Sequence, residues 1–217
     1  MTDQLFKTRG KSEADYYPTR QLLADEGVRL AKHLGWQGGH MLEPGCGNLA
    51  PYINSEHAMT MRSDVLRIGM ELRDVPAEPG IMPGFDYLEA PEDEILIGGE
   101  HGWPLIITNP PFTLATAFVE RSRDLVTPDG LVIMLLRLSI EGSKKRREFW
   151  EANPYLFRYV IRPRPSFSRS TSDNSEYGYF VWASRPVTRM IERLGGPMMV
   201  SRFLDCPDEK GWGRPSD

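Results

Sequence analysis

The sequence has few cysteines and histidines, and it has no long hydrophobic run. Two cysteines, Cys46 and Cys206, occur among 217 residues without the spacing of metal ligands, which argues against a disulfide framework and against a zinc site. The longest apolar stretch, residues 131–136, is far too short to cross a bilayer. Residues 1–7 lack the apolar core of a secretion signal. We therefore expect a cytoplasmic protein with reduced thiols, no membrane partner and no bound metal.

Charge is low overall but unevenly distributed. The net charge of −4 argues against a strongly basic coat for nucleic acid. Residues 71–100 contain nine acidic side chains and one basic, whereas residues 137–169 contain nine basic and three acidic. Such asymmetry is compatible with an anionic partner on one face and equally with two solvated charged patches, so charge alone leaves both interpretations open.

Apolar patterns of helical and strand period alternate along most of the chain. Helices are expected at residues 18–34, 49–59, 114–125, 143–151 and 187–194. Strands are expected at residues 40–43, 65–72, 85–88, 105–108, 131–138, 156–161 and 177–182, with a turn at 127–130. Strands that alternate with helices predict an α/β fold, in which a mostly parallel sheet carries helices on both faces.

The length of 217 residues fits one domain. Residues 1–15 are expected to form a flexible amino-terminal segment and residues 16–184 the domain. Residues 185–217 are expected to form a C-terminal helix and an irregular tail. No stretch is large enough to be an obvious separate domain for target recognition.

Residues 41–48, Met-Leu-Glu-Pro-Gly-Cys-Gly-Asn, combine an apolar strand with a glycine turn. Gly45 and Gly47 leave the backbone unobstructed and permit positive φ, so amides at the turn can meet a polar or anionic ligand. Glu71 follows Gly47 by 24 positions, close to the offset at which an acid ending the second strand holds ribose hydroxyls. The full dinucleotide fingerprint G-x-G-x-x-G is absent, which weighs against NAD. A purely structural tight turn is the alternative.

Residues 105–112, Leu-Ile-Ile-Thr-Asn-Pro-Pro-Phe, form a second motif in which an apolar strand ends in a proline-rich turn. An exocyclic amine on a base is a poor nucleophile, because its lone pair is delocalised into the ring. The side-chain oxygen of Asn109 and the carbonyl of Pro110 can each accept an amino hydrogen, and Pro110 with Pro111 would keep these acceptors preorganised. Phe112 can stack on the target ring. The alternative is a strand exit with no chemistry.

In this order, the two motifs resemble those of class I S-adenosylmethionine-dependent methyltransferases. The first motif of that family is acidic-x-Gly-x-Gly-x-Gly, and Leu49 stands here in place of the third glycine. The tetrapeptide at residues 109–112 resembles the fourth motif of enzymes that methylate amino groups of adenine or cytosine in DNA, of RNA, or of release-factor glutamines. The resemblance implies a single Rossmann-like domain with a mostly parallel seven-stranded sheet, one strand of which, near the C-terminal end, is antiparallel.

The resemblance also implies S-adenosyl-L-methionine as the cofactor and assigns residues to it. Glu43 and Pro44, with the two glycines, would lie near its methionine and ribose parts, and Asn109 would border the same site. Glu71 would accept hydrogen bonds from both ribose hydroxyls. Asp86 would accept one from the adenine amino group, although a turn-capping role is an equal alternative.

Two further segments resemble small phage-type DNA adenine methyltransferases. Residues 15–19, Asp-Tyr-Tyr-Pro-Thr, resemble an amino-terminal Tyr-x-Thr-Pro element that touches the methionine end of the cofactor, which assigns Tyr17 and Thr19 to cofactor binding. Arg20 replaces the usual proline of that element. Residues 162–167, Arg-Pro-Arg-Pro-Ser-Phe, resemble the basic segment after the sixth strand.

In that family the basic segment contacts the target. Phe167 would clamp an extruded base together with Phe112, because the adenine amino group is unreachable inside a stacked duplex. Arg162, Arg164 and Arg169 would approach phosphates. The alternative is that Phe167 anchors a loop and the arginines are solvated.

The leading hypothesis is therefore methyl transfer from S-adenosylmethionine to adenine N6 in DNA, with nucleic acid as the partner. Methylation of RNA or of a protein glutamine uses the same chemistry and stays open. A non-catalytic cofactor-binding subunit is a further alternative, against which the intact tetrapeptide speaks. Neither a recognition sequence nor an oligomeric state follows from the sequence.

Overall fold

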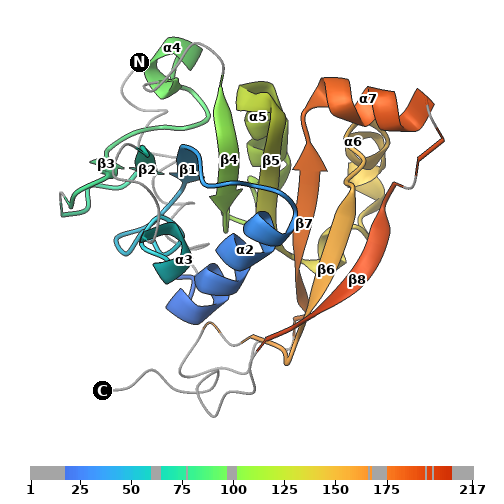
Figure 1. Ribbon diagram of the computed structural model, residues 1–217, viewed down its shortest axis with the longest axis horizontal. Coiled ribbons are helices and arrows are strands. Elements are labelled where there is room, and N and C mark those ends of the chain that lie inside the picture. The colour runs from blue at the N-terminus through green and yellow to red at the C-terminus, as the bar shows by residue number, and fades with distance from the viewer. Residues whose placement is uncertain are drawn as a thin grey trace.

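A single mixed sheet organises the chain (Figure 1). The computed structural model describes residues 18–59, 65–76, 78–96, 102–165, 167, 175–193, 195–196 and 198–206. Within them the strand order is β3-β2-β1-β4-β5-β7-β6-β8. The strands are β1 (Met41–Pro44), β2 (Arg67–Glu71), β3 (Ile81–Pro83), β4 (Trp103–Thr108), β5 (Val126–Arg137), β6 (Phe157–Arg162), β7 (Tyr177–Ala183) and β8 (Val200–Asp205).

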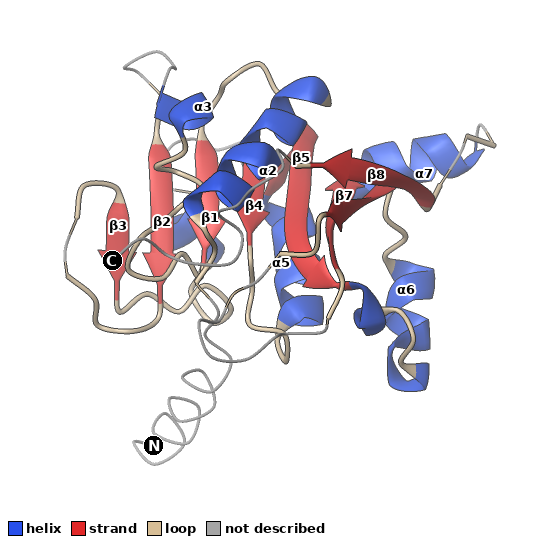
Figure 2. Ribbon diagram, turned by 90° about the horizontal axis from the view of Figure 1, so that it is seen from below, coloured by secondary structure: helices blue, strands red, loops and turns tan. Residues whose placement is uncertain are grey.

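The helices of the described residues are α2 (Gln21–His33), α3 (Glu56–Met59), α4 (Glu92–Ile95), α5 (Ala115–Leu125), α6 (Arg147–Ala152) and α7 (Arg185–Arg193). Two short 3₁₀ turns, η1 (Leu138–Ile140) and η2 (Lys144–Arg146), follow β5. Figure 2 shows α2 and α3 on one face of the sheet and α5 on the other. The expectation of helices on both faces is confirmed. None of the helices in the described ranges has both the length and the apolar character that a membrane span requires.

Strand directions confirm the expected α/β fold. β1 to β5 pair in parallel, and β7 pairs antiparallel with both β5 and β6. β8 pairs in parallel with β6, so β7 is the one reversed strand of the described sheet. β8 raises the strand count from the expected seven to eight. The expectation of an irregular tail was wrong at β8, because the backbone of this segment pairs with β6. The apolar pattern of residues 200–205 is too weak to indicate a strand.

Two other expected elements were wrong. Residues 49–59 form mostly turns, with helix only at α3, because a buried carboxylate takes the backbone N–H groups of Tyr52 and Ile53. Residues 85–88 form a turn, while the strand of that region is β3. The expected turn at 127–130 lies inside β5 as an excursion, since the pairing with β4 jumps from Trp103–Val126 to Leu105–Leu131.

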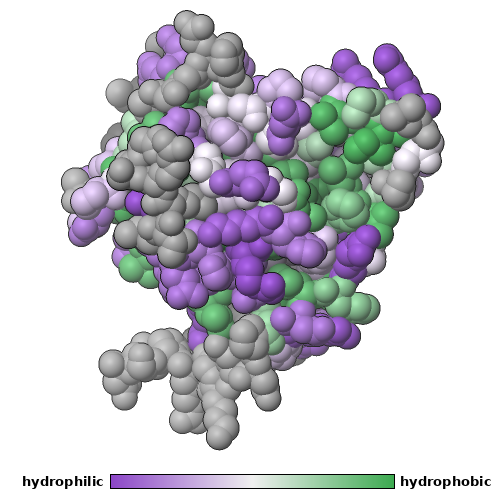
Figure 3. Space-filling model, viewed as in Figure 1, coloured by the Kyte–Doolittle hydropathy of each residue, from purple (hydrophilic) through white to green (hydrophobic). Residues whose placement is uncertain are grey.

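Each face of the sheet has its own hydrophobic core. Leu23, Ile133 and Tyr179 belong to the core under α2, and Phe118 and Met134 to the core under α5. β5 and β7 contribute to both because they are covered on both faces, which explains why their sequences are almost continuously apolar. On the side seen in Figure 3, hydrophobic residues gather over the β6–β8 end of the sheet.

The topology gathers the functional motifs at one edge. Parallel strands end at the same edge of a sheet, and the arrowhead of β4 points to it in Figure 1. β1 and β4 are neighbours in the strand order, so the glycine turn and the proline-rich turn leave the sheet side by side. β7 begins at this edge because it runs in the opposite direction.

Candidate active site

The glycine turn after β1 is tied to the end of β2. The N–H groups of Gly45 and Cys46 donate to the carbonyl of Met70, at 2.7 and 3.1 Å. Gly45 and Gly47 have φ values of 67° and 68°. A residue with a Cβ rarely adopts this conformation, so the backbone geometry accounts for glycine at both positions.

Glu71 lies directly against this turn. Its side chain is buried, and Oε2 accepts a hydrogen bond of 2.8 Å from the N–H of Gly47. Oε1 accepts from the backbone N–H and from Nε of Arg73, at 2.9 and 2.8 Å. A carboxylate has about four acceptor positions, so Glu71 can still take a hydroxyl donor or exchange one of these partners for it. The buried acid and the glycine turn together fit the ribose and the polar groups of a nucleoside cofactor.

Glu43 braces the loop that follows the glycine turn. The residue is 2 % exposed, and Oε2 accepts hydrogen bonds of 3.0 Å from the N–H groups of Tyr52 and Ile53. Burial raises the pKa of Glu43 well above the ordinary glutamate value, because desolvation disfavours the charged form more than the two hydrogen bonds favour it. Burial and the nearby carboxylates likewise raise the pKa of the Cys46 thiol. Cys46 is buried and packs in the core under α2.

The raised pKa of Glu43 predicts a pH-dependent contribution to stability. A group whose pKa is raised by folding stabilises the fold fully below its ordinary pKa, and that contribution is lost as pH rises through the raised value. Glu43→Gln retains an acceptor oxygen but does not titrate. We expect its free energy of unfolding, relative to wild type, to rise between about pH 5 and about pH 8. Urea unfolding at both pH values checks this, and a difference that does not change with pH would contradict it.

A hydrogen bond joins the two motifs. The hydroxyl of buried Thr108, the last residue of β4, donates to the carbonyl of Pro44, the last residue of β1. Pro111 Cδ lies 3.9 Å from the position that a Cβ on Gly45 would occupy, so the two turns are also in close contact beyond the strands. Asn109 follows Thr108 directly, and its carboxamide oxygen is buried although the residue is half-exposed. The expected acceptor therefore borders the glycine turn.

Replacing the hydroxyl of Thr108 tests whether its hydrogen bond affects activity as well as stability. Thr108→Val removes the donor to a buried carbonyl and should cost about 1–3 kcal/mol of unfolding free energy. Ser184→Ala is a matched control, because buried Ser184 donates in the same way to Pro128, at 2.7 Å, where β7 ends at the opposite edge of the sheet. We expect both variants to lose stability in urea titrations and only Thr108→Val to lower the methyl transfer that the sequence predicts. Equal losses of activity would show that the link does not align the two turns.

Aromatic side chains and one arginine surround Phe112. The guanidinium carbon of Arg137 lies 4.3 Å from the Phe112 ring centroid, and Arg137 Nε donates to the hydroxyl of Tyr177 at 3.1 Å. The Tyr177 ring lies 6.0 Å from Phe112 and 4.7 Å from Phe167, centroid to centroid. The structure thus brings Phe112 and Phe167 to one cluster through Tyr177. Sequence reasoning missed Arg137 and Tyr177, although a charged residue closing the apolar run 131–136 was a usable signal.

Thr19 is linked to Tyr52, in the loop that follows the glycine turn. Its side chain is buried and hydrogen-bonds to the hydroxyl of Tyr52. The hydroxyls of Tyr52 and Tyr179 lie 3.3 Å apart, and Tyr179 donates to the carbonyl of Leu23 at 2.6 Å. Thr19 is therefore connected to the loop that Glu43 braces. The other expected residue of this element, Tyr17, lies outside the described residues.

Asp86 has a capping role and is also placed near the site. Its Oδ1 accepts hydrogen bonds from the N–H groups of Leu88 and Glu89, at 3.0 and 3.3 Å. The preceding residue, Phe85, donates its N–H to the carbonyl of Glu71 at 2.9 Å. The capping alternative is thus observed, and Phe85 ties this turn to the end of β2.

The arginines expected at phosphates have carboxylate partners. Arg162 makes two hydrogen bonds to Asp205 on β8, at 2.8 and 2.9 Å. Arg164 lies 3.9 Å from a carboxylate oxygen of Glu176. Arg169 lies outside the described residues. Contact between these arginines and phosphate would have to compete with exposed ion pairs, which are weak.

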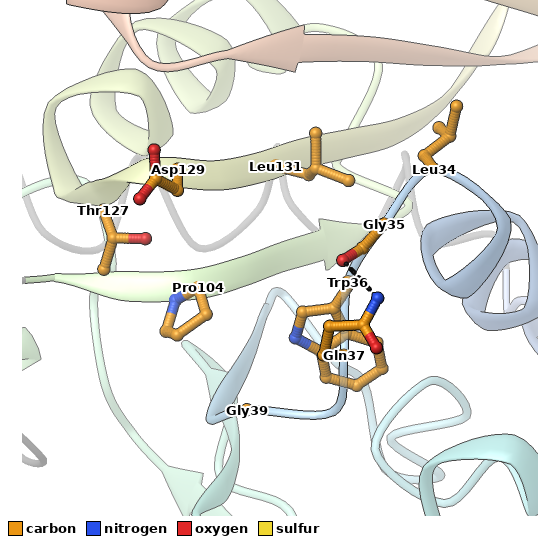
Figure 4. A pocket seen from close by; sticks show the side chains of 9 residues that line it. All are labelled: Leu34, Gly35, Trp36, Gln37, Gly39, Pro104, Thr127, Asp129 and Leu131. Carbon is orange, nitrogen blue, oxygen red and sulfur yellow. Dashed lines mark hydrogen bonds between the residues drawn. The ribbon is translucent and has the colours of Figure 1, made fainter.

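A cavity of about 380 Å³ lies at the opposite edge of the sheet (Figure 4). Its wall combines the chain after α2, including Trp36 and Gln37, with Pro104 of β4 and Asp129 and Leu131 of β5. The cavity is remote from both motifs, because these residues lie at the beginnings of the parallel strands.

Neither protein-family models nor curated proteins match this sequence. Solved structures do share its fold at low identity. A type I restriction-modification methyltransferase subunit from Streptococcus thermophilus has a TM-score of 0.59 and 14 % identity over 79 % of this chain and 45 % of that one. A putative class I S-adenosylmethionine-dependent methyltransferase from Listeria monocytogenes has a TM-score of 0.54 and 15 % identity over 85 % and 65 %.

A putative RNA methyltransferase from Pyrococcus horikoshii has a TM-score of 0.53 and 15 % identity, over 74 % of this chain and 81 % of that one. The chain spans less than half the length of the Streptococcus subunit. At these identities the likeness concerns the fold. The chain has the α/β Rossmann-like fold of class I S-adenosylmethionine-dependent methyltransferases.

Proposed function

We propose that this protein is an S-adenosylmethionine-dependent methyltransferase that methylates the N6 amino group of adenine in DNA. One observation carries the proposal: the Thr108 hydroxyl binds the Pro44 carbonyl, which places the Asn-Pro-Pro-Phe turn beside the glycine turn. The two motifs are 64 residues apart at this bond. Direct transfer of a methyl group requires the cofactor site to lie next to the turn that binds the target amine. The contact between Thr108 and Pro44 supports that arrangement.

The residues around the glycine turn would hold the cofactor. Glu71 would accept hydrogen bonds from the ribose hydroxyls. Asp86, the residue after Phe85, whose N–H donates to the Glu71 carbonyl, would face the adenine end. Glu43 acts through the loop it braces, because its carboxylate already holds two backbone N–H groups. When bound, S-adenosylmethionine supplies a methyl group bonded to a positively charged sulfur. The neutral thioether that remains after transfer is a good leaving group.

The proline-rich turn would prepare the amine. The Asn109 side-chain oxygen and the Pro110 carbonyl each accept one amino hydrogen in this proposal, which turns the nitrogen lone pair away from the ring plane. Pro110 and Pro111 restrict the turn, so the two acceptors need little reorganisation. Positioning then supplies most of the rate enhancement, and the amino proton can leave to water without a dedicated base.

The aromatic cluster supports a nucleobase as the substrate in preference to a glutamine side chain. Phe112 and Phe167 both contact Tyr177, so the ring that follows the proline-rich turn belongs to an aromatic cluster. Stacking of a base on an aromatic side chain contributes about 1–3 kcal/mol, whereas an aliphatic amide gains much less from such a surface. Extrusion of the base from the duplex would precede stacking.

Transfer of tritium from labelled S-adenosylmethionine tests the proposal. Unmethylated duplex DNA, single-stranded DNA, RNA and a release factor would each be offered to the purified protein. We expect incorporation into DNA, with N6-methyldeoxyadenosine identified by mass spectrometry of the digested product. Incorporation only into RNA or only into the release factor would refute the DNA assignment, and no incorporation into any of them would refute the enzyme.

A further inference from the structure

We infer that Arg137 is a positioning residue for the target base, acting through the ring of Phe112. The inference rests on the proposed function, because it assigns Phe112 the task of stacking on the extruded base. Arg137 is the last residue of β5, the strand next to the one that ends in the Asn-Pro-Pro-Phe turn. Arg137 is therefore part of the sheet, whereas Phe112, which it contacts, belongs to the turn.

The geometry holds the guanidinium between two aromatic partners. Its carbon lies 4.3 Å from the Phe112 centroid and 5.9 Å from that of Tyr177. The hydrogen bond of 3.1 Å from Nε to the Tyr177 hydroxyl fixes the side chain, since Tyr177 is fully buried in β7 and pairs directly with Arg137 across the two strands. Phe112 itself is only half-buried and follows two prolines.

A cation over one face of an aromatic ring holds the ring plane by electrostatic attraction to the negative π face. Phe112 is then kept in a single orientation, so a base that stacks on it would meet the acceptors of Asn109 and Pro110 in one register. Arg137 acts without touching the base.

A double-mutant cycle between Arg137→Met and Phe112→Ala tests the inference. Arg137→Met keeps the aliphatic stem but removes the charge and the donor. We expect kcat/KM for unmethylated DNA to fall about two- to thirtyfold, the range of a cation–π contact, with the Kd for S-adenosylmethionine unchanged. Arg137→Lys should recover part of the loss. In the Phe112→Ala background, Arg137→Met should cause no further loss, because the ring through which it acts is gone.

Arg202→Met is the matched control. The guanidinium of Arg202, on β8, lies 5.4 Å from the Phe157 centroid, so the variant removes a similar contact three strands away from β5. It should leave DNA kinetics unchanged. Losses that add in the double variant, or an Arg137→Met enzyme with wild-type kinetics, would overturn the inference while the wild-type activity on DNA stands. A wild-type protein that methylates no DNA would overturn the proposed function and the inference together.

Discussion

Asn109→Ala should reduce methyl transfer about a hundred- to a thousandfold while cofactor affinity stays nearly unchanged. The side-chain oxygen of Asn109 is buried at the end of β4, beside the turn that would hold the cofactor. Its removal takes away one of two acceptors for the amino hydrogens, and the remaining Pro110 carbonyl cannot orient the nitrogen alone. Single-turnover transfer from tritiated S-adenosylmethionine measures the rate, and calorimetric titration measures the cofactor affinity.

Asn109→Asp is the companion variant. It keeps an acceptor oxygen of the same reach, so it should retain more of the rate than Asn109→Ala. Thermal unfolding of both variants monitors the fold. If Asn109→Ala lost cofactor binding as severely as transfer, Asn109 would be a cofactor ligand and the amine-gripping role would be wrong.

Glu71→Ala should weaken S-adenosylmethionine binding about a hundredfold or more. Hydrogen bonds to a charged acceptor contribute about 1.5–3 kcal/mol each, and two ribose hydroxyls would lose theirs. The variant also releases the N–H of Gly47, which the carboxylate holds at 2.8 Å, so the glycine turn loses a brace. Isothermal titration calorimetry with S-adenosylmethionine and with S-adenosylhomocysteine measures the effect.

Two controls separate the ribose contact from general charge. Glu71→Gln preserves the shape and one acceptor oxygen but weakens the contact to Arg73, so its affinity should fall between wild type and Glu71→Ala. Exposed Glu89→Ala removes a carboxylate from the same acidic stretch and should bind normally. If Glu71→Ala bound S-adenosylmethionine with normal affinity, the proposed cofactor site at the end of β2 would be wrong.

Local sequence determined much of the fold and the positions of the two turns. The apolar runs that became β4, β5 and β7 were recognisable because both faces of those strands are covered, and α5 followed from its helical spacing. Glycine and proline marked the two turns correctly, since positive φ and restricted φ are properties of the residues themselves. The order of strands and motifs then predicted that Glu43, Glu71 and Asn109 would meet at one edge.

The tertiary structure decided how those residues are connected. Glu43 disrupts the expected helix by binding two backbone N–H groups, Thr108 ties β4 to β1, and Arg137 covers Phe112. The residues in each of these contacts are not related by the repeat of a helix or a strand, so no local sequence pattern indicates them. β8 likewise depends on the free edge of β6. The propensity to form a helix, strand or turn depends on neighbouring residues. A hydrogen bond or a ring contact between distant residues exists only after the sheet has brought them together.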